Sequence, residues 1–309
     1  MEGKEFLKKI EKEMEKCIVG KKEVIKLLTI ALLANGHVLL EGNPGIAKTT
    51  IAKNFAKLFG LKFSRIQLTP DTMPSDIIGI NYYNQKTGNF EIKKGPIFAN
   101  IVLADEINRT PPKTQSALLE AMQERQVTIE GNVFELPKPF MLIATKNPIE
   151  HEGVYELPEA QLDRFMFKIN LEYPKKDEEI EMLKKKHLGN FWEVNSVISE
   201  VDLKYAYIGV KDVHVSDEIL EYIVNIVNAT RTDDRLLYGA SPRASEHLLF
   251  ASKALAFLNG RKYVIPDDVK ELAFYVLNHK IRVKAEYEME DINVKDVIED
   301  ILKNTEVPK

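Results

Sequence analysis

The sequence predicts an α/β fold, in which a parallel sheet is sandwiched by helices and followed by a smaller all-α domain. Short apolar runs alternate with helical stretches up to about residue 175. These runs carry apolar residues on both faces, which is typical of buried parallel strands. Beyond Pro174 the apolar spacing is helical only. We therefore expect an α/β domain over residues 1–175 and a helical lid over residues 176–309.

Periodicity and helix-ending residues place the elements in order. Two helices come first, because apolar residues recur at helical spacing between Lys and Glu and the second helix runs into Asn35-Gly36. Helix 242–259 begins with a cap, Ser241, and a first-turn proline, Pro242. The expected strands are 37–41, 63–68, 101–104, 140–145 and 166–171, and the expected helices are 6–17, 21–33, 48–58, 113–126, 177–188, 217–231, 242–259, 266–280 and 291–302.

Composition excludes several classes of protein. The chain has 309 residues and a formal net charge of −4, which does not favour a chain built around nucleic-acid phosphates. Cys17 is the only cysteine, so no internal disulfide or thiolate zinc site can form. The longest apolar stretch, residues 27–40, is interrupted by polar residues and too short to span a bilayer. The charged N-terminus does not read as a signal peptide. We expect a cytoplasmic protein without a membrane span.

A glycine-containing loop between a strand and a helix is the strongest chemical signal. The segment GNPGIAKT, residues 42–49, has the spacing of a P-loop, whose backbone N–H groups cradle phosphates. Lys48 can reach the β- and γ-phosphates, and Thr49 can ligate Mg²⁺. The usual signature has Gly before the Lys, whereas Ala47 stands here, which is sterically mild if its φ is negative. The predicted ATP-binding residues of this loop are Asn43, Pro44, Gly45, Ile46, Ala47, Lys48, Thr49 and Thr50.

A second signal is a buried strand that ends in two acids, Asp105 and Glu106. Such a pair is usually just a solvated strand end. After a P-loop in the same α/β unit, it predicts a Walker B motif. We expect Asp105 to hold Mg²⁺, largely through its water shell, and Glu106 to polarise the attacking water.

Three further polar residues are weaker candidates. Asn147 follows the strand 140–145 and either orients the water or only turns the chain before Pro148. Arg164 precedes the last strand, and Arg243 lies in the first turn of helix 242–259. A guanidinium can stabilise charge on transferring phosphate oxygens, although a single Arg is more often a surface ion pair.

Two polar excursions interrupt the alternating pattern. Residues 127–136 predict a β-hairpin, and residues 81–89, which include Tyr82 and Tyr83, predict an exposed excursion. Such segments often bind partners, but they can equally be ordinary connections.

Taken together, these residues resemble the MoxR family of AAA+ ATPases over about residues 5–284. The loop GNPGIAKT looks like the family's own variant, with Ala before the Lys. ADEINRTPPKTQSALLEAMQERQVTIEG, IATKNPIEHEGVYELPEAQLDRF and ASPRAS resemble its Walker B, sensor 1 to arginine-finger, and sensor 2 regions. Lys146 departs from the pattern, since the family often has Gln there.

The resemblance implies roles that spacing alone does not give. Asn147 would be sensor 1, Arg164 the arginine finger reaching a neighbour's ATP, and Arg243 sensor 2, acting in cis or in trans. Val19 and Gly20 would lie by the adenine. Residues of about 80–98 would form the helix-2 insert, and the hairpin of about 127–136 the pre-sensor-1 insert.

The resemblance also implies an assembly and partners. The family forms homo-oligomeric rings, typically hexamers, partners von Willebrand factor A-domain proteins, and acts as a chaperone that hydrolyses ATP with Mg²⁺. One alternative is a nucleic-acid motor, which would need basic residues on the two inserts. Residues 127–136 argue against it, because they contain Glu130 and Glu135 but no Lys or Arg. Another alternative is a nucleotide-gated binding switch. Glu106 argues against it, because a pure switch does not need a catalytic base.

Overall fold

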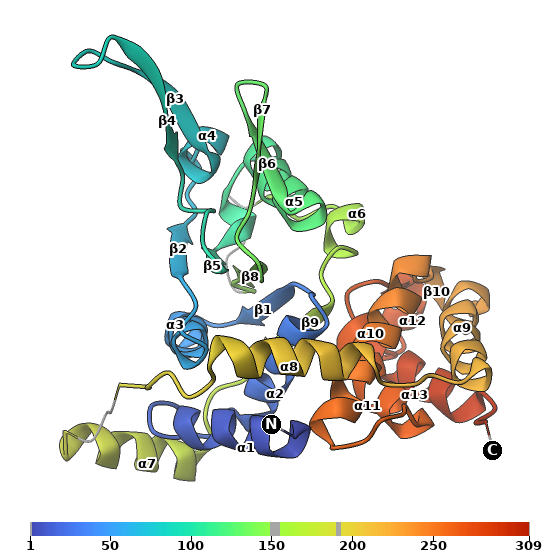
Figure 1. The fold of residues 1–309 in the computed structure, drawn as a ribbon. Helices are drawn as coiled ribbons and strands as arrows, with labels where there is room; N and C mark the ends of the chain where they lie inside the picture. Colours follow the sequence, from blue (N-terminus) through green and yellow to red (C-terminus); the bar gives the residue numbers. More distant parts are fainter. Residues whose placement is uncertain (1, 149–154, 190–192, 309) are drawn as a thin grey trace.

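A five-stranded parallel sheet forms the centre of the molecule (Figure 1). The computed structural model describes residues 2–148, 155–189 and 193–308. The strand order is β2-β5-β8-β1-β9, and every neighbouring pair is parallel. The carboxyl ends of all five strands therefore meet at one edge of the sheet. The strands are β1 (Val38–Gly42), β2 (Phe63–Gln67), β5 (Ile101–Asp105), β8 (Met141–Lys146) and β9 (Phe167–Leu171).

Helices cover both faces of this sheet, as the fold class predicts. Along β1, Val38 and Leu40 belong to one buried cluster and Leu39 to the other, because successive side chains alternate between faces. The first cluster includes residues of α1 (Gly3–Met14), α2 (Lys22–Leu33) and α3 (Lys48–Leu58). The second includes residues of α4 (Pro74–Ile78) and α5 (Pro112–Glu124).

Two antiparallel hairpins rise from the sheet on the same side of the molecule (Figure 1). One pairs β3 (Gly79–Asn84) with β4 (Asn89–Lys94), and the other pairs β6 (Gln126–Ile129) with β7 (Asn132–Glu135). Both excursions expected from the sequence are therefore hairpins. Short helical turns, η1 (Ile107–Arg109) and α6 (Glu159–Leu162), follow β5 and precede β9.

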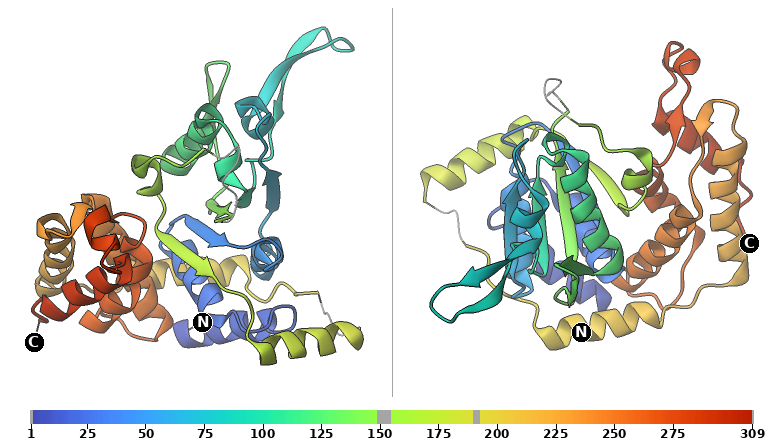
Figure 2. Two further views of the ribbon diagram at one scale, coloured as in Figure 1. Left: turned by 180° about the vertical axis from the view of Figure 1, so that it is seen from behind. Right: turned by 90° about the horizontal axis from the view of Figure 1, so that it is seen from above.

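The chain after β9 is mainly helical, and its C-terminal helices gather beside β9, away from the β3–β4 hairpin (Figure 2). A short pair of strands, β10 (Leu236–Tyr238) and β11 (Arg282–Val283), is the exception among the described residues. Two of these helices, α8 and the short α12, were not expected from the sequence. The helices are α7 (Lys176–His187), α8 (Glu200–Lys211), α9 (Asp217–Thr232), α10 (Pro242–Leu258), α11 (Pro266–Leu277), α12 (Ala285–Glu288) and α13 (Val294–Asn304).

None of the described helices has the length and apolar character that a membrane crossing needs.

Candidate functional site

The P-loop lies at the carboxyl edge of the sheet, between β1 and the first turn of α3. The backbone reverses at Gly45, whose φ is 84°. Lys48 is 9% exposed, and its Nζ donates a hydrogen bond to the Gly42 carbonyl at 2.5 Å. Thr49 and Thr50 lie in the first turn of α3, where free backbone N–H groups and the helix dipole favour an anion. The loop thus has the donors and the charge that a phosphate chain needs.

Ala47 departs from what the sequence suggested. Its φ is 68° and its ψ is 21°, in the left-handed region, so the condition under which alanine would be sterically mild here, a negative φ, is not met. The chain must turn sharply between the loop and α3, and the turn imposes this conformation whether or not the residue is glycine. A left-handed alanine costs about 1–2 kcal/mol.

This strain gives a prediction about stability. Because a β-branched side chain is far less tolerant of positive φ, Ala47→Val should lower the free energy of unfolding by about 1–2 kcal/mol. The matched control, Ala47→Gly, should be at least as stable as the wild type. Chemical denaturation of the three proteins measures the difference. Equal stability of the Val and Gly variants would show that residue 47 does not need a positive φ.

The two acids at the end of β5 are held by a hydrogen-bonded cluster from neighbouring strands. Thr145 of β8 donates to Asp105 Oδ1 at 2.6 Å and accepts from the backbone N–H of Glu106 at 2.8 Å. Arg65 of β2 contacts Asp105 Oδ2 through Nε at 3.1 Å and Nη2 at 2.7 Å. Gln67 donates to Glu106 Oε2 at 2.8 Å. The strand order therefore brings β2, β5 and β8 together around the predicted Walker B pair.

The chemistry of these groups fits the ligands that Mg²⁺ prefers. A hydroxyl on Thr49 and a carboxylate on Asp105, completed by water and phosphate oxygens, make such a set. No cluster of three or more His, Cys, Asp or Glu suitable for a metal occurs in the described parts of the chain.

Three cluster residues were not singled out from the sequence. Arg65 and Gln67 alternate along β2, so they point to the same face, and this polar pair inside an apolar strand was a readable signal. Thr145 is buried near the end of β8, two residues before the predicted sensor Asn147.

The remaining predicted residues of this edge lie around the loop. Asn147 is 4% exposed and follows β8, the strand that pairs with β1 in the sheet. Val19 and Gly20 lie between α1 and α2, and Lys21 donates to the Glu172 carbonyl at 2.8 Å, which ties this turn to the end of β9. A cavity of about 380 Å³ opens between the start of the P-loop and the end of β9; it is lined by Glu41, Gly42, Asn43, Pro148, Asn170, Leu171, Glu172 and Tyr173.

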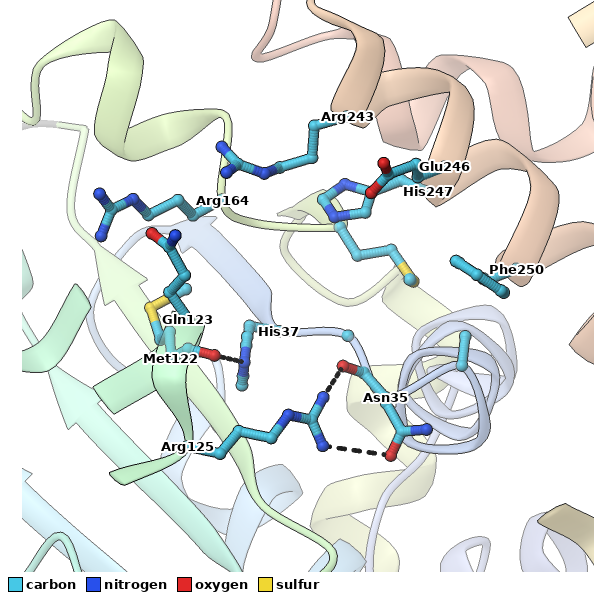
Figure 3. A pocket seen from close by; sticks show the side chains of 13 residues that line it. Asn35, His37, Met122, Gln123, Arg125, Arg164, Arg243, Glu246, His247 and Phe250 are labelled. Carbon is cyan, nitrogen blue, oxygen red and sulfur yellow. Dashed lines mark hydrogen bonds between the residues drawn. The ribbon is translucent and has the colours of Figure 1, made fainter. Parts of the chain in front are cut away.

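The two predicted arginines lie at the opposite edge of the sheet. Arg164 and Arg243 line one cavity of about 380 Å³, together with Asn35, His37 and Arg125. Figure 3 shows both guanidinium groups pointing to the same side of that cavity. Arg164 Nη1 donates to the Leu119 carbonyl at 3.0 Å, while its buried Nε has no hydrogen-bond partner within the described residues.

His37 helps to build this edge. It is buried, and burial lowers the pKa of its imidazole to about 4, so the ring is neutral at physiological pH. Its Nδ1 accepts from the Leu142 N–H at 2.9 Å, which leaves Nε2–H to donate to the Met122 carbonyl at 3.0 Å. The ring therefore joins β8 to the end of α5.

The separation of the two edges follows from the register of β1 and β9. Val38 pairs with Phe167 and Gly42 with Leu171, so Arg164 lies before the start of β9 while the P-loop follows the end of β1. The four residue steps from Val38 to Gly42 span roughly 13 Å at about 3.3 Å per residue. Arg164, with Arg243 in the same cavity, therefore lies at the amino edge, away from the P-loop of its own chain.

Comparisons with known proteins agree with this geometry. Residues 37–167 match the family model described as ATPase family associated with various cellular activities (AAA), and residues 228–301 match the AAA lid domain. The fold and the P-loop edge define an AAA ATPase.

Relatives that match over most of their length identify the family within this class of ATPases. The chain is 46% identical to Uncharacterized protein YeaC of Bacillus subtilis, with 98% of this chain and 95% of that protein covered. It is 44% identical to Chaperone MoxR1 of Mycobacterium tuberculosis (96% and 81% covered) and 30% identical to Protein MoxR of Methylorubrum extorquens (97% and 94% covered). A crystal structure of a proposed ATPase from Cytophaga hutchinsonii superposes with a TM-score of 0.92 at 45% identity, covering 99% and 96% of the two chains. The chain belongs to the MoxR family of AAA ATPases, and membership implies nucleotide binding.

Proposed function

We propose that the protein hydrolyses ATP at sites shared between neighbouring copies of the chain in a ring, and uses this turnover to remodel protein partners. The observation that carries the proposal is the separation of the two edges. The P-loop and the acids lie at the carboxyl edge, and both arginines lie at the amino edge. A head-to-tail interface would bring the amino edge of one copy to the carboxyl edge of the next, and such an interface closes into a ring when the rotations between copies add up to a full turn.

Each residue of the carboxyl edge has a role in this proposal. The backbone of residues 43–50 and the Lys48 ammonium bind the phosphates, and Asn147 orients the attacking water. Thr49 and Asp105 would hold Mg²⁺, which would offset the negative charge of the phosphates. Glu106 accepts the proton of the attacking water, or polarises it, once it is free of Gln67 and of Arg109, whose Nη1 lies 3.3 Å from Oε2.

Arg164 and Arg243 both act in trans in this proposal. Arg164 lies in the wall of the cavity at the amino edge, where its guanidinium can meet an anion supplied by the next subunit. Arg243 lines the same cavity, which supports its action on the neighbour's nucleotide rather than its own. Arg109, an alternative finger, lies beside Glu106 of its own chain.

The decisive test is ATP turnover per subunit against protein concentration, with the oligomeric state measured on the same samples by mass photometry. We expect turnover to disappear as the ring dissociates. Constant turnover down to the monomer would refute the shared site.

Thr145 offers a sharper probe of the carboxyl edge. Thr145→Val keeps the side-chain volume but removes both hydrogen bonds that position Asp105 and Glu106. Misplacement of catalytic groups by about 1 Å can cost ~10²-fold, so we expect kcat to fall by about that factor. Thr145→Ser keeps the hydroxyl and should retain most of the activity. If the Val and Ser variants turn over equally, this cluster does not position the reacting groups.

The β3–β4 hairpin is the proposed contact for a protein partner. Tyr83 and Phe90 are 53% and 70% exposed and pack edge to face at the tip of the hairpin, which projects from the body (Figure 1). Exposed aromatic pairs of this kind mark binding surfaces. A hexameric ring and a von Willebrand factor A-domain partner remain predictions, as does the cytoplasmic location.

We expect Tyr83→Ser/Phe90→Ser to reduce the stimulation of ATP turnover by a permanently unfolded protein, reduced carboxymethylated α-lactalbumin, about tenfold, since each aromatic anchor contributes roughly 1 kcal/mol or more. Leu237→Ser, which removes a side chain that is 60% exposed on β10, is the control. Stimulation by a single-stranded DNA oligonucleotide instead would favour the nucleic-acid motor.

A further inference from the structure

A buried lysine from the lid holds the backbone on both sides of Arg164. The side chain of Lys280, just after α11, is 0% exposed. Its Nζ donates to the Asp163 carbonyl and, at 2.8 Å, to the Phe165 carbonyl. The same ammonium lies 3.4 Å from Asp163 Oδ1. The residues immediately before and after Arg164 are therefore fixed by one cation.

Three more lid side chains form hydrogen bonds with Asp163 or Phe165. At the start of α10, Ser241 donates to both carboxylate oxygens of Asp163 at 2.9 Å, and Arg243 Nη1 donates to Oδ2 at 2.9 Å. His279 lies 2.9 Å from the Phe165 carbonyl through Nε2. The lid thus holds Asp163 and Phe165, the residues on either side of Arg164 in the chain.

The charges around Lys280 are consistent with a cation held at this point. Burial lowers the pKa of Lys280 to about 8, against the opposing effect of the Asp163 carboxylate. The carboxylate of Asp163 and the two carbonyls that accept from Nζ favour the charged form of the lysine. A charge this deeply buried is retained only when paired and hydrogen-bonded, and both conditions are met here.

We infer that Lys280 is a positioning residue for Arg164, through which the lid sets the direction of the arginine that reaches the neighbouring subunit. This rests on the proposed function, in which Arg164 acts in trans. The ammonium ties two carbonyls that bracket Arg164 to the lid, so a rotation of the lid moves the arginine with it. Lys280 contacts residues that precede β9, at the edge away from its own P-loop, so its effect is on turnover rather than on ATP binding.

The test is a double-mutant cycle in the assembled protein. Single-turnover hydrolysis of radiolabelled ATP and binding of a fluorescent ATP analogue are measured for wild type, Lys280→Met, Arg164→Ala and the double variant. We expect Lys280→Met to lower the hydrolysis rate about 10²-fold with analogue affinity unchanged, because a misplaced catalytic group costs about that much. The double variant should be no slower than Arg164→Ala, since a residue that acts through another adds nothing once that residue is gone.

Two further variants guard against a merely structural effect. Lys253→Met removes another lid lysine that donates to a backbone carbonyl, that of Lys211, and should leave turnover unchanged. Asp163→Asn keeps the side-chain volume and removes the charge pairing with Lys280. It takes the place of Lys280→Met in the double-mutant cycle if that variant does not fold or assemble.

The outcomes separate the two claims. Full turnover in Arg164→Ala refutes the arginine finger, and with it the proposed function. Loss of turnover in Arg164→Ala but not in Lys280→Met or Asp163→Asn refutes only the positioning role. The positioning role is also refuted if the loss of turnover in the double variant equals the combined losses of the two single variants.

Discussion

Replacing Arg164 with alanine is expected to lower ATP turnover by about 10³-fold or more, the usual effect of losing an arginine finger. The affinity for ATP should change little, because Arg164 lies at the amino edge of the sheet, away from its own P-loop. Steady-state turnover and equilibrium binding of a fluorescent ATP analogue separate the two effects. Arg125→Ala is the control, since Arg125 lines the same cavity but donates to the Asn35 carbonyl at 2.7 Å.

A different pattern would contradict the shared site. If Arg164→Ala weakened ATP binding and turnover equally, the arginine would act on its own nucleotide. If Arg125→Ala were as damaging as Arg164→Ala, the defect would lie in the shape of the amino edge and not in one guanidinium.

The second large effect is expected for Glu106→Gln. The amide keeps the hydrogen bond with Gln67 but cannot accept a proton, so we expect kcat to fall about 10²–10⁴-fold while ATP stays bound. Single-turnover hydrolysis measures the loss, and retained nucleotide after gel filtration measures binding. Glu120→Gln, an exposed carboxylate on α5, serves as the control.

Substantial turnover in Glu106→Gln would remove the proposed base. The binding-switch alternative would then regain weight, because a switch needs no residue at this position.

Local chemistry made much of the carboxyl edge predictable. The P-loop, the acids at residues 105 and 106, and the helix that begins at Lys48 depend on neighbours in the sequence, and the structure has them as expected. Helix α8 was missed because its exposed apolar residues, among them Val201 and Tyr205, hide the amphipathic period. The cap at Ser199, which accepts from the Asp202 N–H, was the available signal.

Long-range arrangement could not be predicted in the same way. The clamp of Lys280 on residues 163–165 joins segments more than 100 residues apart, and only the packing of the lid against β9 creates it. Arg65 and Thr145 contact Asp105 because their strands, β2 and β8, flank β5 in the sheet. This strand order could not be predicted from the sequence. The positive φ of Ala47 depends on the turn geometry, which the identity of the residue does not reveal.

The most direct test of the shared site is to mix two inactive variants. Subunits of Glu106→Gln keep the arginine finger, and subunits of Arg164→Ala keep the base. In random rings made from equal amounts, about a quarter of the interfaces join an intact base to an intact finger, so about a quarter of the wild-type turnover should return if sites act independently. Turnover that stays at the level of the separate variants, although mixed rings are shown to form, would contradict the account.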